Sequence, residues 1–237
     1  MSAPRASIVP RSRFWWQLSK SVAHAMCLLW FRVRAEGRDA VPASGPVLLV
    51  ANHASYLDPP LVGIHCRREV NFLAQAGLAK FGPLRWWLRQ VGVTLIDRDA
   101  PSKVALRLIA ESLGAGEVVG IFPEGTRSAD GAVAPFKTGV EFLVRRTGAT
   151  VVPVGIDGAQ RAWPRRAWLP RPRQIVVRYG EPWSAERVLA PGGVEALRAR
   201  IAELARVPLR AARADAAART APGADPIDPT VSAGGRA

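Results

Sequence analysis

The chain has 237 residues and a formal charge of +14, since 33 Lys and Arg side chains stand against 19 Asp and Glu. Apolar residues at 49% and charged residues at 22% are typical of a globular domain, which excludes a largely disordered chain and a collagen-like repeat. Two cysteines exclude a disulfide scaffold and a thiolate metal cluster. The excess of positive charge predicts an anionic partner: a nucleic acid, an anionic bilayer or a phosphorylated small molecule.

The longest apolar stretch, residues 14–31, is interrupted by polar side chains. A helix that spans a bilayer needs about 20 mostly apolar residues, whereas this stretch contains Gln17, Lys20 and His24. Wound as a helix, it gathers apolar side chains on one face and these polar ones on the other, with Arg near both ends. This pattern favours a helix that lies in the headgroup layer of a membrane. An ordinary amphipathic helix packed on the domain is the alternative.

Beyond this stretch, short β-like runs alternate with helical patterns. The runs that indicate strands are residues 32–36, 47–51, 69–74, 93–96, 118–122, 151–156 and 174–179. Several are almost continuously apolar, as in strands covered on both faces. Helices are predicted near residues 59–67, 83–91, 102–113, 138–147 and 194–206. The alternation predicts a layered α/β fold with a largely parallel, seven-stranded sheet flanked by helices.

The composition predicts three parts of the chain. Residues 1–31 form an interfacial N-terminal segment, residues 32–210 an α/β domain, and residues 211–237 a tail. The tail is rich in Ala, Arg, Pro, Gly and Asp and has no apolar periodicity, which is typical of disorder.

A first candidate site lies in the loop after the predicted strand 47–51. His53 stands at the carboxyl end of a buried strand, where α/β folds place their sites. Helical geometry would set His53 and Asp58 about 140° apart, so they meet only if the segment turns between them. If they meet, Asp58 holds one imidazole N–H and the other nitrogen accepts a proton from a substrate hydroxyl. The alternative is that Asp58 caps a helix that begins at Pro59 and that His53 is an ordinary loop residue.

A second candidate site follows the predicted strand 118–122 and contains Glu124, Gly125, Thr126 and Arg127. The planar guanidinium of Arg127 suits phosphate oxygens, and the hydroxyl of Thr126 adds a donor. Glu124 is expected either to steer Arg127 or to accept a hydrogen bond from a substrate hydroxyl. The alternative is a surface turn with a local ion pair.

These two loops, in this order and about 70 residues apart, resemble the signatures of a known family. NHASYLD is similar to the Asn-His-x-x-x-x-Asp signature of the PlsC-like glycerolipid acyltransferases, and IFPEGTRS is similar to their second major signature. The further segments that resemble blocks of this family are residues 92–98, 135–139 and 152–154. The resemblance runs from about residue 33 to about residue 179 and implies the α/β fold of that family.

The resemblance implies transfer of an acyl chain from a thioester to the free hydroxyl of a lysophospholipid, first of all lysophosphatidic acid. His53 would be the general base and Asp58 the residue that orients it. The residues that would hold the headgroup of the acceptor are Arg98, Glu124, Gly125, Thr126 and Arg127. No cofactor is implied, because acyl carrier protein or coenzyme A enters as the co-substrate that carries the acyl chain.

Other residues are expected to play no chemical part. No spacing of His, Cys and Asp suggests a metal site. Cys66 lies outside both signatures and is more plausible as a small buried side chain than as a nucleophile.

One position departs from the family and bears on the acceptor. Gln75 stands where many members carry Lys, and a neutral amide adds no charge for an anionic headgroup. The acceptor could therefore be another lyso-lipid, such as a lyso-ornithine lipid.

Residues 161–171 interleave Arg with Trp and contain no acid, which favours an anionic membrane surface. A solvated loop with cation–π pairs is the alternative. We expect association with the cytoplasmic face of the inner or plasma membrane. A basic protein that binds nucleic acid or membrane without catalysis is the competing class, but no recognition helix or RNA-binding signature is present, so no nucleic acid is expected.

Overall fold

The computed structural model describes only part of the chain. The described residues are 14–15, 17–18, 21–22, 25, 29–75, 93–96, 102–164, 167 and 169–211. The predicted helix at 83–91, Arg98 and nearly all of the tail lie outside them, so these predictions and the three-part division of the chain remain predictions.

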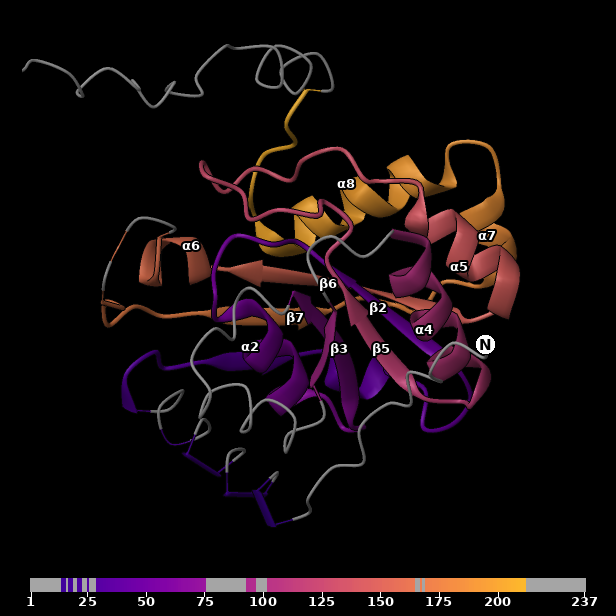
Figure 1. Ribbon diagram of the computed structural model, residues 1–237. Coiled ribbons are helices and arrows are strands. Elements are labelled where there is room, and N and C mark those ends of the chain that lie inside the picture. The colour runs from indigo at the N-terminus through magenta and orange to yellow at the C-terminus, as the bar shows by residue number, and fades with distance from the viewer. Residues whose placement is uncertain are drawn as a thin grey trace, which may run out of the picture.

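A mixed but largely parallel β-sheet forms the centre of the domain (Figure 1). Its strands lie in the order β1-β7-β6-β2-β5-β3-β4, and only β6 and β7 are antiparallel neighbours. The strands are β1 (Arg34–Glu36), β2 (Val47–Ala51), β3 (Val70–Gln75), β4 (Val93–Ile96), β5 (Val118–Ile121), β6 (Thr150–Asp157) and β7 (Val176–Tyr179). The predicted layered, largely parallel α/β fold is confirmed.

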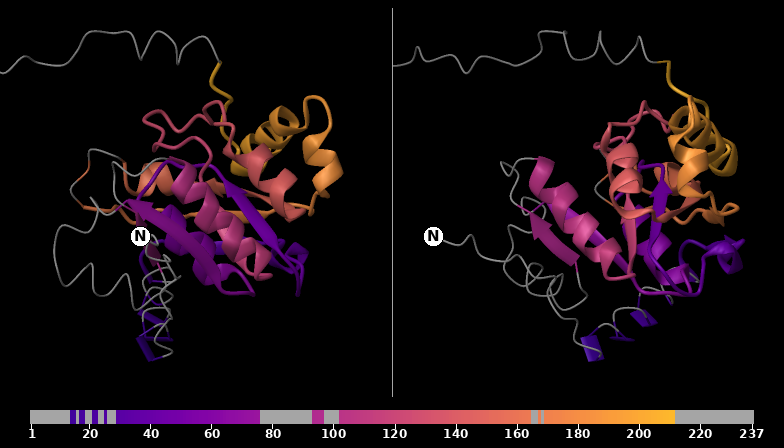
Figure 2. Two further views of the ribbon diagram at one scale, coloured as in Figure 1. Left: turned by 45° about the vertical axis from the view of Figure 1, so that its right-hand side comes forward. Right: turned by 90° about the vertical axis from the view of Figure 1, so that its right-hand side faces the viewer.

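Helices cover both faces of this sheet (Figures 1 and 2). Those predicted from periodicity are α2 (Asp58–His65), α4 (Ser102–Gly114), α5 (Gly139–Thr147) and α8 (Gly193–Ala205). The short elements that the sequence analysis missed are η1 (Arg38–Ala40), α6 (Ala159–Ala162) and α7 (Ala185–Leu189). With three to five residues, they are too short to show a helical period.

Alternate side chains of β2 enter two separate cores. Val47 and Leu49 join the cluster that contains α2, and Leu48 and Val50 join the cluster that contains α4, α5, α7 and α8. All five residues of β2 are buried as a result. Burial on both faces is the reason why the strand is apolar at every position rather than at alternate positions.

The parallel register of β2 brings distant loops together. Val50 pairs with Ile121 of β5 on one side, and Ala51 pairs with Val154 of β6 on the other. Because parallel strands end at the same edge of a sheet, the loops that follow β2 and β5 emerge side by side. This edge carries both candidate loops of the sequence.

Gly155 of β6 permits a close approach between the sheet and α8. A methyl group at this position would overlap the backbone of Leu204 and Ala205. We predict that Gly155→Ala lowers the free energy of unfolding by about 1–3 kcal/mol, since α8 must shift away from the sheet. Urea-induced unfolding measures this loss.

The matched control is Gly114→Ala, where no atom lies within 4 Å of the added methyl. This change should leave the stability unchanged or raise it by up to about 1 kcal/mol. An equal loss in both variants would contradict close packing at Gly155.

Candidate active site

His53 and Asp58 form a hydrogen-bonded pair just beyond β2. Nδ1 of His53 lies 2.8 Å from Oδ2 of Asp58. The chain turns over residues 55–57 before α2 begins, which is the turn that this contact requires. Asp58 is fully buried, whereas 20% of the His53 side chain is exposed. The imidazole therefore reaches the surface of the site while the carboxylate behind it is shielded from water.

The Asp58 carboxylate is held by the loop that precedes it. Oδ2 also accepts hydrogen bonds from the backbone N–H groups of Ala54 and Ser55, both at 2.7 Å. The alternative, in which Asp58 caps a helix that begins at Pro59, is wrong, because Asp58 is the first residue of α2 and Leu57 occupies the cap position. An ionised carboxylate only accepts hydrogen bonds, so Nδ1 donates and Nε2 of the neutral ring remains an acceptor.

The imidazole of His53 packs against a stack of aromatic rings. The ring of His53 stacks on Phe122, with 4.3 Å between the ring centres, and Phe122 stacks in turn on Phe72 at 6.1 Å. The ring of Phe72 occupies the space where Gly120 has no side chain. No role was predicted for Phe122, although its place directly after a buried strand and within the second signature was a usable signal.

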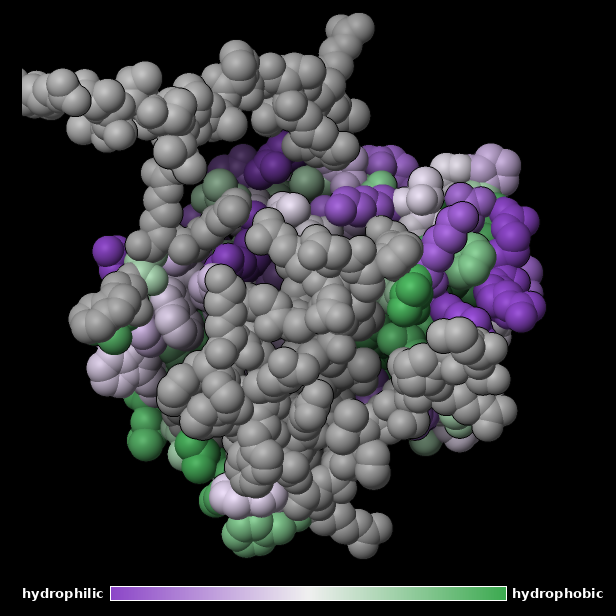
Figure 3. Space-filling view, viewed as in Figure 1, coloured by the Kyte–Doolittle hydropathy of each residue, from purple (hydrophilic) through white to green (hydrophobic). Residues whose placement is uncertain are grey.

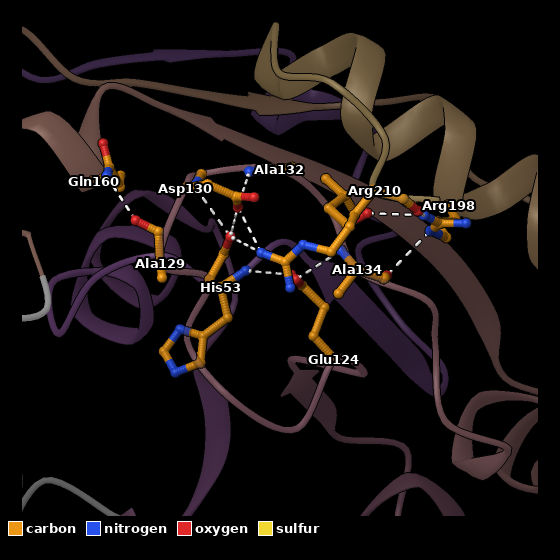
Figure 4. Close-up of polar contacts among 12 residues, drawn as sticks. His53, Glu124, Ala129, Asp130, Ala132, Ala134, Gln160, Arg198 and Arg210 are labelled. Carbon is orange, nitrogen blue, oxygen red and sulfur yellow. Dashed lines mark hydrogen bonds and ion pairs between the residues drawn. The ribbon is translucent and has the colours of Figure 1, made fainter. Parts of the chain in front are cut away.

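Glu124 joins the second loop to the first. Oε1 accepts from the backbone N–H of His53 at 2.8 Å, and Oε2 accepts from that of Ala134 at 3.0 Å (Figure 4). Burial raises the pKa of Glu124, whereas the hydrogen bonds from Ala134 and His53 oppose that rise. The expectation that Glu124 steers Arg127 is wrong, because both of its oxygens are bonded to backbone groups.

Arg127 lies on the other side of the same loop. Its guanidinium carbon is 3.5 Å from the centre of the Tyr56 ring, and its buried Nη1 has no hydrogen-bond partner among the described residues. A buried donor without a partner is costly unless a ligand satisfies it. Arg127 therefore has a buried donor that the described part of the protein leaves unsatisfied.

The turn at Gly125 brings a second cation to this region. Gly125 has φ of 74°, a left-handed conformation that glycine adopts without strain. The amino group of Lys137 lies against this turn, in the space that a side chain at 125 would fill. Thr126, next in the chain, is exposed. Lys137 falls in the family-like block 135–139, and no role at the site was predicted for it.

The structure brings His53, Asp58, Glu124 and Arg127 to one edge of the sheet. The side chain of Gln75 lies outside the described part, as does Arg98. Among the described residues, no group of three or more His, Cys, Asp and Glu side chains is placed to hold a metal ion. Fold and site together define an α/β protein with a hydrogen-bonded His–Asp pair and an Arg with a buried unpaired donor at the same edge of its sheet.

Comparison with known proteins names the family. The Acyltransferase family model matches residues 32–157, more than half of the chain. The chain belongs to this family, as the two signatures indicated.

The chain is also similar to individual members of known activity. It is 31% identical to a chloroplast 1-acyl-sn-glycerol-3-phosphate acyltransferase of Arabidopsis thaliana, over 65% of this chain and 44% of that protein. It is 33% identical to a lyso-ornithine lipid O-acyltransferase of Pseudomonas aeruginosa, over 65% of this chain and 57% of that protein. The chain thus spans about half the length of these relatives.

A crystal structure supports the same relationship. The 1-acyl-sn-glycerophosphate acyltransferase PlsC of Thermotoga maritima matches with a TM-score of 0.66 and 28% sequence identity, covering 87% of this chain and 80% of that one.

The bridge made by Glu124 can be tested through stability. We predict that Glu124→Gln lowers the free energy of unfolding by about 1–3 kcal/mol, because the amide nitrogen cannot accept from the backbone N–H that it faces. The loss should be larger near pH 4 than near pH 8. An acid with a raised folded pKa stabilises the fold below its ordinary pKa of 4.5, and that contribution is lost as the pH rises through the folded value.

Urea unfolding at the two pH values measures both effects. Glu181→Gln, at an exposed position, is the control for loss of one carboxylate. A loss that grows between pH 4 and pH 8 would contradict the raised pKa.

Proposed function

We propose that the chain transfers a fatty acyl group from an acyl thioester to the free hydroxyl of lysophosphatidic acid, which forms phosphatidic acid. The contact between His53 and Asp58 carries this proposal, because it leaves Nε2 of His53 as a fixed acceptor for the hydroxyl proton. The names of the relatives supply the substrate class: several are 1-acyl-sn-glycerol-3-phosphate acyltransferases.

The reaction needs no covalent enzyme intermediate. Nε2 of His53 takes the proton, the hydroxyl oxygen attacks the thioester carbonyl carbon, and the carbon–sulfur bond breaks. The proton then passes from the imidazolium to the leaving thiolate. Asp58 stabilises the positive charge that the ring carries between these steps. A thioester already has a good leaving group, so positioning and proton removal supply the catalysis.

Arg127 and Lys137 are the described cations suited to the acceptor headgroup. The unpaired Nη1 of Arg127 supports this role, and the stacking on Tyr56 fixes the plane of its guanidinium. Arg98 is proposed as a third cation from the family resemblance alone. A lyso-ornithine lipid is the second candidate acceptor, supported by the similarity to the Pseudomonas aeruginosa enzyme and by Gln75.

The acyl donor is proposed to be a thioester of acyl carrier protein or of coenzyme A. Either donor presents the same thioester carbonyl to the attacking hydroxyl, and the basic surface suits both an acidic carrier protein and a phosphorylated cofactor.

Membrane association is proposed from the N-terminal segment. Its described side chains Phe14, Val22 and Leu29 are 68%, 62% and 85% exposed. Figure 3 shows hydrophobic residues in green at the lower left, where Figure 1 draws this segment in indigo. No helix among the described residues is long and apolar enough to cross a bilayer. These exposed apolar side chains support a segment that lies on a membrane surface. The cytoplasmic face is proposed from the sequence-based expectation alone.

Only part of the loop at 161–171 is described, because Arg165, Arg166 and Trp168 lie outside the described residues. Trp163 is half-buried, and its indole N–H donates to the carbonyl of Ala167 at 3.0 Å. Leu169 is 63% exposed and is the described apolar side chain of the loop that is free to meet lipid.

The general-base assignment predicts that His53→Ala lowers kcat by about 10²- to 10⁴-fold, the range that a positioned base contributes. Cys66→Ala is the matched control, since its buried thiol has no part in the reaction. Product mass, measured across lyso-lipid acceptors and both donors, is the readout. Equal kcat in the His53→Ala variant and wild type would contradict the proposal. Loss of all turnover in a folded Cys66→Ala variant would contradict it as well.

The headgroup assignment predicts that Arg127→Ala raises KM for lysophosphatidic acid by about tenfold or more, because a charge-assisted contact to phosphate is lost. KM for the acyl donor should change little. Arg145→Ala, on the exposed face of α5, is the matched control. An unchanged KM for the acceptor would remove Arg127 from the headgroup site.

A further inference from the structure

The last described residues of the chain lie against the loop that follows the active-site glutamate. We call residues 207–211 the C-terminal strap and residues 129–134 the strapped loop. The N–H of Val133 donates to the carbonyl of Pro208 at 2.9 Å, and the N–H of Arg210 donates to the carbonyl of Val133 at 3.0 Å. In Figures 1 and 2 the strap, in yellow, runs beside this loop, in pink.

Arg198 of α8 fastens the two segments together. It is 4% exposed, yet its guanidinium points to backbone carbonyls instead of a buried acid (Figure 4). Nε donates to the carbonyl of Ala134 at 3.1 Å, and Nη2 donates to that of Val133 at 2.9 Å and to that of Arg210. Nη1 donates to Glu195, whose side chain is 64% exposed.

Arg210 forms a second set of hydrogen bonds, to side chains at the start of the strapped loop and just before it. Its Nη2 donates to Oδ1 of Asp130 at 2.5 Å and to Oγ of Ser128 at 3.2 Å. The hydrogen bond from Arg210 lowers the pKa of Asp130 to about 2. Asp130 therefore stays ionised and keeps accepting this bond at any pH near neutrality.

These contacts lead directly to the catalytic histidine. The carbonyl of Ala134 is held by Arg198, and the N–H of the same residue donates to Glu124, which accepts from the N–H of His53. The carbonyl of His53 accepts from the N–H of Ser128 at 2.7 Å. The N–H of His53 is thus linked to Arg198 through Glu124 and Ala134, and its carbonyl is linked to Arg210 through Ser128. In Figure 4 the imidazole points away from this network.

We propose that Arg198 is a positioning residue for the acyl-transfer reaction: by binding the strapped loop it holds Glu124 against the backbone of His53 and sets the place of the imidazole. This inference rests on the proposed role of His53 as the base. Removing a buried cation from water is costly, and three backbone carbonyls with one largely exposed carboxylate, that of Glu195, compensate this cost only in part. An apolar residue could fill this space without that cost. The hydrogen bonds from the guanidinium to the strapped loop and the strap therefore explain the arginine better than packing does.

The shape of the guanidinium explains why Lys would not serve equally. Arg198 donates from three nitrogens to four acceptors on three segments of the chain. An ammonium group is a single point with three donors and cannot span these directions. Arg198→Lys should keep the charge but lose some of the hydrogen bonds that align the strapped loop with the strap.

The test compares Arg198→Ala and Arg198→Lys with two controls in the full chain. Arg200→Ala removes another Arg of the same helix. Among the described residues, Arg200 forms its ion pair with Glu203 and does not reach the strapped loop. Val188→Ala removes buried volume in α7, far along the chain from the strapped loop, and matches the expected loss of stability. We expect Arg198→Ala to lower kcat by about 10- to 100-fold with little change in KM for the donor, which is the effect of a misplaced base.

Arg198→Lys should fall between wild type and Arg198→Ala, and both controls should keep the wild-type kcat. Unchanged kcat in Arg198→Ala would overturn the proposal. So would an equal loss of kcat in Val188→Ala, if the two variants have the same free energy of unfolding.

A second readout does not depend on activity. Hydrogen exchange of the His53 and Ala134 amides, followed by NMR, should accelerate at least tenfold in Arg198→Ala and stay unchanged in Val188→Ala. If wild type proves inactive towards every acceptor, the proposed function fails, while this exchange still decides whether Arg198 holds His53. Unchanged exchange would overturn the positioning role even in an active enzyme.

Discussion

The active site depends on one buried oxygen atom, Oδ2 of Asp58, which accepts three hydrogen bonds at once. Two come from the backbone of its own loop and one from the imidazole of His53. A buried carboxylate is tolerated only when donors compensate it, so the loop must fold around Asp58 in one way. That fold turns Nδ1 of His53 towards Asp58 and leaves Nε2 for the hydroxyl group in the proposed reaction. The register of β2 beside β5 then brings the Glu124 loop to the same place.

The sequence predicts the framework well because its signals are local. β2 and β5 are apolar at almost every position, which is the mark of strands covered on both faces. The contact between His53 and Asp58 could not be decided from spacing, since it requires a turn that the spacing alone does not establish. The family signature, rather than geometry, pointed to that pair, and the structure shows how the turn is made.

The contacts that position the site were harder to predict, because they join residues far apart in the chain. The bond between Glu124 and the N–H of His53 involves the backbone, which no side-chain pattern reveals. Arg198 did leave a signal: it lies four residues after Val194 and three before Ile201, on the apolar stripe of α8. A cation on the buried face of a helix indicates a specific partner. The Arg side chains thus differ in environment: Nη1 of Arg127 has no partner among the described residues and is proposed to meet the headgroup, whereas Arg198 binds backbone carbonyls of the chain itself.

The central claim, that Asp58 fixes His53 with Nε2 as the proton acceptor, is tested most directly by the tautomer of the ring. Nitrogen-15 NMR of selectively labelled imidazole distinguishes a protonated nitrogen from a bare one. In wild type at neutral to mildly alkaline pH, the neutral ring of His53 should carry its proton on Nδ1 alone. In Asp58→Asn this preference should be lost or reversed. A neutral His53 ring protonated on Nε2 in wild type, or the same tautomer in both proteins, would contradict the account.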